Sequence, residues 1–203
     1  MMSQFTQFTD ALETYLSADH AIDDCAHYVA GQLRQLIAQP TWLEECHRQG
    51  CIQEPQANLV YVSPQGHFSV VAFVWQAGQQ TCIHDHVCWC VVGVLQGVEQ
   101  ETSYRLKRIE RQQPWLEFQE TRTLEPGHVC QLVPPHEDIH QVRNIGSETA
   151  ISIHVYGTDI GKRGTSINRR FDNLSIQEHT EDSVPVNWRT LNLGEAVGIQ
   201  LES

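Results

Sequence analysis

Two histidines, His84 and His86, are separated by one residue inside a segment with the composition of a β-strand. Successive side chains of a strand point to opposite faces, so both imidazoles project to the same side, about 7 Å apart along the backbone. Two neutral imidazoles in this arrangement can bind one metal ion. The alternative is that both face solvent on an edge strand. The segment runs from Gly78 to Gly97 and reads GQQTCIHDHVCWCVVGVLQG.

Several cysteines lie close to these histidines in the sequence. Cys88 and Cys90 share the parity of His84, so a flat strand would present all of these side chains on one face. On such a strand His84 and Cys90 would lie about 20 Å apart, too far to share an ion, whereas a bend after His86 would bring one sulfur closer. Packing as a small buried hydrophobic residue is the favoured role of Cys88. The total of seven cysteines is odd and argues against a disulfide framework.

A later segment alternates polar and apolar residues. Ser152, His154 and Tyr156 fall on every second position, so on a strand they face one side together. In a barrel interior they would form a hydrogen-bonded row that fixes the phenol beside an open metal position and exchanges protons there. The alternative is a polar ladder that only satisfies its own hydrogen bonds. A nucleophilic hydrolase is not favoured, because no nucleophile elbow or acidic partner is evident.

The motif spacing resembles that of the cupin superfamily. Gly78, five further residues, the two histidines and then Gly97 resemble the first cupin motif, and His140 followed by Asn144 resembles the second. Within that superfamily the region from Asn58 to Gly161 is similar to the cysteine dioxygenase (thiol dioxygenase) family.

Two details carry this narrower resemblance. The family has a cysteine where most cupins have an acidic ligand, and Cys90 occupies that position here. The family's Ser-x-His-x-Tyr signature is present as Ser152, His154 and Tyr156.

The expected fold is mainly β: a cupin-type antiparallel β-barrel (double-stranded β-helix or jelly roll) with N-terminal α-helices. Residues 1–50 have helical periodicity and are expected to pack on the barrel, and short strands between glycine and proline turns over residues 51–161 predict the barrel itself. One of these strands is expected to run from His84 to Leu95. Residues 162–203 are expected to form an irregular tail laid over the barrel, with the whole chain one structural domain.

The predicted metal ligands are His84, His86 and His140. Three imidazoles leave positions open on an octahedral ion, which suits Fe(II) binding substrate and O₂ together, but zinc with three histidines and a water is a rival. The resemblance favours Fe(II). It also implies that a small thiol, such as cysteine or 3-mercaptopropionate, binds as the thiolate and receives both atoms of O₂ to give a sulfinic acid. Alternatives are another metal-dependent cupin enzyme, such as a diketone-cleaving oxygenase or an isomerase, and a non-catalytic binding module.

Substrate recognition is expected to depart from the family. An arginine or glutamine just before the first barrel strand binds the substrate carboxylate there, but the aligned residue here is Ala57. Gln56 and Arg163 are the candidate replacements. The resemblance further implies a thioether cross-link between Cys90 and Tyr156, with Cys88 as the competing sulfur.

Charge limits the partners of the chain. Thirteen basic and twenty-five acidic residues give a net charge of −12, which argues against binding nucleic acid or an anionic membrane. The sequence has no apolar run near 18 residues and no secretory signal pattern, so a cytoplasmic protein is expected. The sequence does not predict an oligomeric state.

Overall fold

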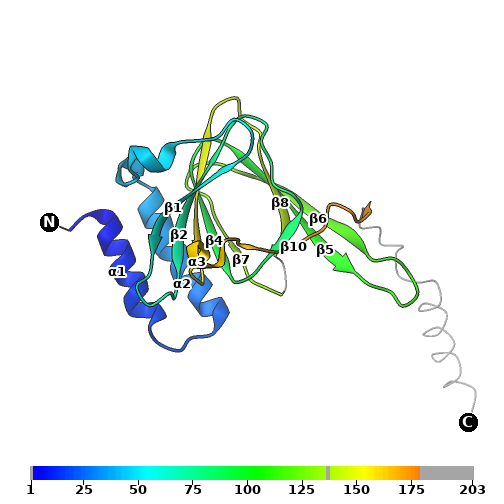
Figure 1. Ribbon diagram of the computed structural model, residues 1–203, viewed down its shortest axis with the longest axis horizontal. Helices are drawn as coiled ribbons and strands as arrows, with labels where there is room; N and C mark the ends of the chain where they lie inside the picture. The colour runs from blue at the N-terminus through cyan, green and yellow to red at the C-terminus, as the bar shows by residue number, and fades with distance from the viewer. Residues whose placement is uncertain (1, 136–137, 179–203) are drawn as a thin grey trace, which may run out of the picture.

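The computed structural model describes residues 2–135 and 138–178, and they form a two-sheet β-barrel with helices on one side (Figure 1). The expected cupin-type, mainly β fold with N-terminal helices is confirmed. Among the described helices, none has the length and hydropathy needed to cross a bilayer. The elements are α1 (Gln4–Leu16), α2 (Ile22–Ile37), two 3₁₀ turns (Pro40–Trp42 and Glu45–Arg48), β1 (Gln56–Val62), β2 (Ser69–Trp75), β3 (His84–His86), β4 (Cys90–Gln96), β5 (Glu99–Lys107), β6 (Trp115–Leu124), β7 (Val129–Leu132), β8 (Ile139–Asn144), β9 (Ala150–Tyr156), α3 (Ile160–Arg163), β10 (Ile167–Arg170) and β11 (Ile176–Gln177).

The inner and outer faces of the first sheet have different environments. This sheet has the strand order β1-β2-β9-β4-β7, and the second sheet has the order β10-β3-β8-β5-β6-β11. Strand β9 lies at the centre of the first sheet and is buried along its whole length. Its odd-numbered residues Ile151, Ile153 and Val155 belong to the core under the helices, whereas Tyr156 packs in a separate cluster inside the barrel. The period of two therefore sends the polar side chains of β9 inward.

Helices α1 and α2 cover the outer face of this first sheet (Figure 1). Leu12 of α1 and Leu33 of α2 are fully buried in one cluster with Val91 of β4. Gly93 permits the close approach of α2, because a Cβ atom there would lie 3.0 Å from side-chain atoms of Leu33 and Ile37. The helices thus cover the outer face of the first sheet, and the polar residues of both sheets face the interior between them.

The expected continuous strand from His84 to Leu95 is wrong. The chain leaves one sheet after β3 and joins the other at β4, and residues 87–89 cross between them. The Val87 N–H donates to the Ser166 carbonyl, and Gly157 N–H donates to the Trp89 carbonyl, each at 3.0 Å. The Trp89 indole also packs so closely on Gly157 that a Cβ there would lie 2.3 Å from the ring. These long-range contacts end the strand, and local composition does not reveal them.

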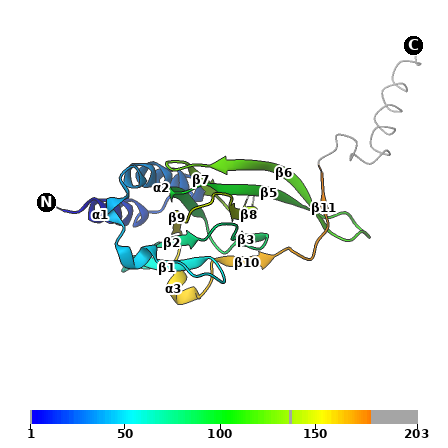
Figure 2. The same cartoon turned by 90° about the horizontal axis from the view of Figure 1, so that it is seen from above.

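The expected irregular tail is also wrong over residues 167–170 and 176–177, which form strands. Strand β10 pairs antiparallel with β3, as Figure 2 shows, and β11 pairs in parallel with β6. The Arg169 guanidinium anchors β10 by binding the buried Asp85 carboxylate, with 2.7 Å between Nε and Oδ2. Residues 179–203 of the expected tail lie outside the described residues.

Candidate metal centre and active site

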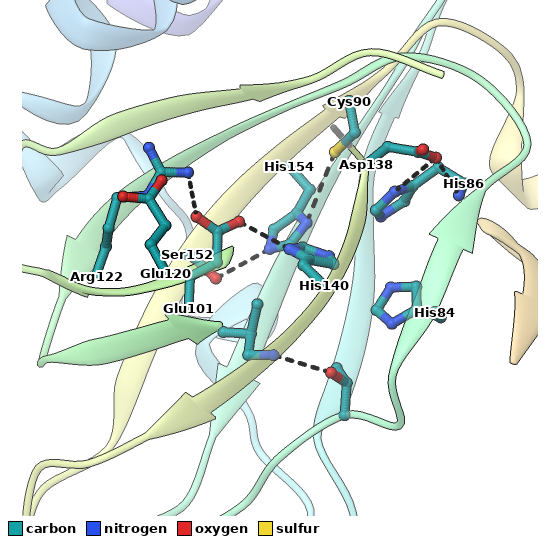
Figure 3. A network of polar contacts seen from close by, with 12 residues as sticks. His84, His86, Cys90, Glu101, Glu120, Arg122, Asp138, His140, Ser152 and His154 are labelled. Carbon is teal, nitrogen blue, oxygen red and sulfur yellow. Dashed lines mark hydrogen bonds and ion pairs between the residues drawn. The ribbon is translucent and has the colours of Figure 1, made fainter. Parts of the chain in front are cut away.

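Three buried histidines meet inside the barrel. His84 and His86 lie on β3, and His140 lies on β8 directly opposite His84. The centroids of each pair of rings are 4.9 Å apart, and one nitrogen from each residue lies within 4.8 Å of the others. Figure 3 shows the three rings facing a common point. The structure therefore brings the three predicted ligands together as a compact group.

Hydrogen bonds on the outer side of the rings define which nitrogen faces inward. His140 Nδ1 lies 2.8 Å from a Glu101 oxygen, and His84 Nδ1 lies 3.0 Å from the Cys82 carbonyl oxygen. A carboxylate and a carbonyl only accept, so both Nδ1 atoms carry the proton and both Nε2 lone pairs are available to an ion. His86 Nδ1 is buried without a hydrogen bond among the described residues, 3.9 Å from Asp138.

The surroundings keep the imidazoles of His84 and His86 neutral. Burial, with the neighbouring His140, lowers the pKa of His84 to about 4 and that of His86 well below its ordinary value. A neutral imidazole is the form that ligates a metal. Three buried imidazoles, two of them with outer hydrogen bonds, fit a divalent transition metal.

Two carboxylates support the histidines from behind. Glu101 of β5 is 2% exposed and lies between His140 and the Arg122 guanidinium, which is 3.0 Å away (Figure 3). Burial alone would raise the pKa of Glu101, but His140 and Arg122 outweigh it and hold the pKa below its ordinary value. Asp138 accepts the backbone N–H of His86 at 2.9 Å. Both residues fix ligand orientation, and the sequence analysis did not identify either.

The polar residues of β9 form a hydrogen-bonded row beside the histidines. Trp75 donates its indole N–H to Ser152 Oγ at 3.0 Å. Ser152 Oγ lies 3.0 Å from His154 Nε2, and His154 Nδ1 lies 3.2 Å from the Tyr156 hydroxyl. Burial lowers the pKa of His154 to about 3, and the positive charge that the neighbouring His140 would carry adds to the effect. The neutral imidazole can therefore accept a hydrogen bond at one nitrogen and donate a hydrogen bond from the other.

Cys90 lies at the outer end of this row. It pairs directly with Tyr156 across β4 and β9, and its sulfur lies 3.9 Å from His154 Nδ1. Burial raises the pKa of the Cys90 thiol well above its ordinary value, so the thiol stays protonated. Cys88 lies instead in the crossover between sheets, where burial raises its pKa to about 11. Cys88 nevertheless packs against the cluster that contains Cys90 and Tyr156, and among the described residues neither sulfur belongs to the metal-binding group around His84.

A cavity of about 540 Å³ opens beside Tyr156. Phe73, Gln56 and Arg170 also line it. The Gln56 amide donates to the carbonyl of the neighbouring Ala57 at 3.1 Å, so one of its donors is already engaged. Arg163, the other residue expected to bind substrate, is exposed and lines a different hollow with Ser63 and Lys162.

A buried acid lies near the inner end of the row. Glu99 is 0% exposed, and neither of its carboxyl oxygens has a hydrogen-bond partner among the described residues. Burial raises its pKa to about 8; the neighbouring Ser152 hydroxyl opposes the rise and Glu101 adds to it. Glu99 is therefore largely protonated at neutral pH. The sequence offers a signal for it, because Glu99 and Glu101 share the parity of a strand that starts right after Gly97.

Comparison with known proteins gives a family match over the barrel. A family model described as cysteine dioxygenase type I matches residues 53–162, more than half of the 203 residues. Among solved structures, the chain is similar to a conserved protein with a double-stranded β-helix domain from Klebsiella pneumoniae (17% identity over 56% of this chain and 80% of that one, TM-score 0.45). It is also similar to the protein TT1209 from Thermus thermophilus (19% identity, 57% and 96% covered, TM-score 0.41). A third is an RmlC-like cupin protein from Desulfovibrio desulfuricans (19%, 54% and 88%, TM-score 0.37).

Replacing Glu101 by glutamine should weaken metal binding. The amide no longer accepts the His140 N–H as a charged group, and such outer partners change metal affinity by roughly 10- to 100-fold. Anaerobic competition between the protein and a chelator for Fe(II) measures the effect. Glu120→Gln is the matched control, because Glu120 also contacts Arg122 but is exposed. Equal Fe(II) affinity in the Glu101 and Glu120 variants would contradict this support role.

Replacing Glu99 by glutamine should change how stability depends on pH. The folded-state pKa of Glu99 is raised to about 8, so folding takes up a proton and the free energy of unfolding falls as pH rises from about 4.3 towards 8. In the variant the free energy of unfolding should not fall in this way. The difference in this free energy between variant and wild type should therefore grow by about 1.4 kcal/mol per pH unit in that range. Urea unfolding at pH 5.5, 6.5 and 7.5 measures the difference. In the exposed control Glu110→Gln, the free energy of unfolding should depend on pH as it does in the wild type. If Glu99→Gln also showed the wild-type pH dependence, the acid would not be buried.

Proposed function

This chain belongs to the cysteine dioxygenase type I family, and from that membership we propose that it is an Fe(II)-dependent thiol dioxygenase acting on a small thiol. The reaction places both atoms of O₂ on the sulfur, which loses four electrons while O₂ gains four, and the product is a sulfinic acid. The observation that best supports the proposal is the three-histidine group lying beside the row of Ser152, His154 and Tyr156. A binding module has no need of such a row.

The metal would be held by the Nε2 atoms of His84, His86 and His140. When bound, Fe(II) supplies a redox-active centre with open positions for substrate and O₂. Glu101 and Asp138 keep two of the rings in place, which lowers the cost of ordering them as the metal binds.

The row on β9 can hold or move a proton at the Tyr156 oxygen. In one arrangement Ser152 donates to His154 Nε2 and His154 Nδ1 donates to Tyr156, which frees the phenol proton to point elsewhere. In the other, Tyr156 donates to Nδ1 and Nε2 donates to Ser152. Burial, with Cys90 nearby, raises the pKa of Tyr156 well above its ordinary value, so the phenol stays protonated and can donate a hydrogen bond in the cavity that it lines.

Iron-loaded protein should consume O₂ with a small thiol and release a sulfinic acid, one O₂ per thiol. An oxygen electrode and mass spectrometry of the product, run over cysteine, 3-mercaptopropionate, cysteamine and 2-mercaptoethanol, measure the reaction. His140→Ala should lose both stoichiometric iron and activity, because it removes one ligand of three. Exposed His27→Ala on α2 is the control and should retain both. Zinc as the bound metal, with no O₂ uptake on any thiol, would rule the dioxygenase out.

We also propose that Cys90 and Tyr156 form a thioether in the active protein. The two residues are direct cross-strand partners, and Cβ atoms in such pairs lie about 4.5–5.5 Å apart. Forming the bond removes one hydrogen from the thiol and one from the ring, and O₂, the co-substrate of the proposed reaction, would take up both hydrogens as hydrogen peroxide. The link would fix the phenol that ends the proton-carrying row.

The intact mass of protein recovered after turnover should fall by the mass of two hydrogens. This loss should disappear in Cys90→Ser and persist in Cys88→Ser, because only Cys90 is paired with Tyr156. An unchanged mass in fully active wild-type protein would show that no cross-link forms.

A further inference from the structure

Glu99 is a buried acid that the proposed reaction does not use. It lies on β5, its side chain is 0% exposed, and neither carboxyl oxygen has a hydrogen-bond partner among the described residues. An unpaired polar group in the interior destabilises the fold, so a partner for this carboxyl is expected close by.

The Ser152 hydroxyl on β9 is the polar group that faces Glu99 across the barrel. It lies close enough to oppose the rise that burial causes in the pKa of Glu99. Asn144, the cross-strand partner of Glu99 on β8, is already engaged, because its amide donates to two backbone carbonyls. Ser152 is therefore the group through which Glu99 can act on the site.

The other titratable or charged groups around Glu99 in the described chain are bound elsewhere or uncharged: Glu101, Arg122, Cys130 and His154. The first two form an ion pair with each other. Burial raises the pKa of the Cys130 thiol and lowers the pKa of His154 to about 3, so both side chains are neutral near pH 8. The group beside Ser152 that changes charge near pH 8 is therefore Glu99.

The protonated form of Glu99 favours one direction of the hydrogen bonds along the row. Ser152 Oγ already accepts the indole N–H of Trp75. If it also accepts the carboxyl O–H of Glu99, both of its acceptor positions are filled, and its own proton goes to His154 Nε2. His154 then carries its proton on Nδ1 and donates it to the Tyr156 oxygen, so the phenol proton is free to point into the cavity.

The ionised form of Glu99 favours the reverse direction. A carboxylate only accepts, so the Ser152 proton turns to Glu99 and Ser152 Oγ accepts the N–H of His154 Nε2. The Nδ1 atom of His154 is then without a proton and accepts the phenol proton of Tyr156. In this state the phenol proton points away from the cavity.

We propose that Glu99 is a positioning residue that sets the direction of the hydrogen bonds in this row and thereby turns the phenol proton of Tyr156 towards the cavity. The inference rests on the proposed function for the use of that proton in turnover, but not for the direction of the bonds. Glu99 acts through Ser152 and His154, so it needs no contact with the substrate.

The nitrogen-15 chemical shifts of the His154 ring report its tautomer. They can be measured between about pH 6 and pH 9.5 on the full chain loaded with diamagnetic Zn(II), with His154→Gln used to assign the signals. In the wild type the proton should move from Nδ1 to Nε2 with a midpoint at about pH 8. Glu99→Gln should keep the Nδ1 proton throughout, because its amide donates to Ser152 and does not ionise. Exposed Glu110→Gln is the matched control and should behave as the wild type.

Turnover of the iron-loaded enzyme gives a second readout. At each pH, the ratio of kcat/KM between Glu99→Gln and the wild type cancels the ionisation of the thiol substrate. This ratio should rise about 10-fold between pH 6 and pH 9, since only about one tenth of a group with a pKa of about 8 is protonated at pH 9.

Several results would overturn the inference. These are a wild-type His154 tautomer that does not change with pH, a change in Glu99→Gln equal to that in the wild type, or a constant ratio of kcat/KM. If Glu99→Gln does not fold, Glu99→Leu takes its place, and a wild-type change of tautomer in that variant counts against the inference. A Glu99-dependent tautomer in a protein that takes up no O₂ at any pH would refute the dioxygenase proposal and leave the direction of the hydrogen bonds standing.

Discussion

Burial and close approach keep the imidazoles of His84 and His86 neutral in the interior of this barrel. Two adjacent charges in a buried site would repel each other and lose their hydration, and the lowered pKa values of His84 and His86 express this cost. The outer acceptors, such as Glu101, fix the orientation of the rings. Neutral donors already directed at one point reduce the cost of metal binding.

The sequence was sufficient to predict the fold and much of the site. The period of two placed His84 with His86, and Ser152 with His154 and Tyr156, and the structure keeps each set on one face. These predictions succeeded because alternation is a local property of a strand. His140 required the family resemblance, since nothing in its own neighbourhood shows that β8 lies beside β3.

Long-range contacts explain what the sequence analysis missed. The strand ends after His86 because Trp89 packs on Gly157, which is distant in the sequence, and neither residue signals this contact by itself. Strand β10 has only four residues, too few to display a period. Glu99 and Glu101 could have been identified in principle, because two acids of one parity on a strand share one face, and here that face points into the barrel.

The two adjacent arginines of β10 have different surroundings only because they occupy successive positions on a strand. Arg169 and Arg170 are chemically identical, and only the alternation of the strand sends one to Asp85 and the other to the cavity. Shifting β10 by one residue against β3 would turn each side chain to the other face. The length of the short connection between α3 and β10 therefore determines the charge of the cavity as directly as the arginine does. An alignment of relatives in this segment has to follow the strand register, because residue identity cannot distinguish the arginine that binds Asp85 from the one that lines the cavity.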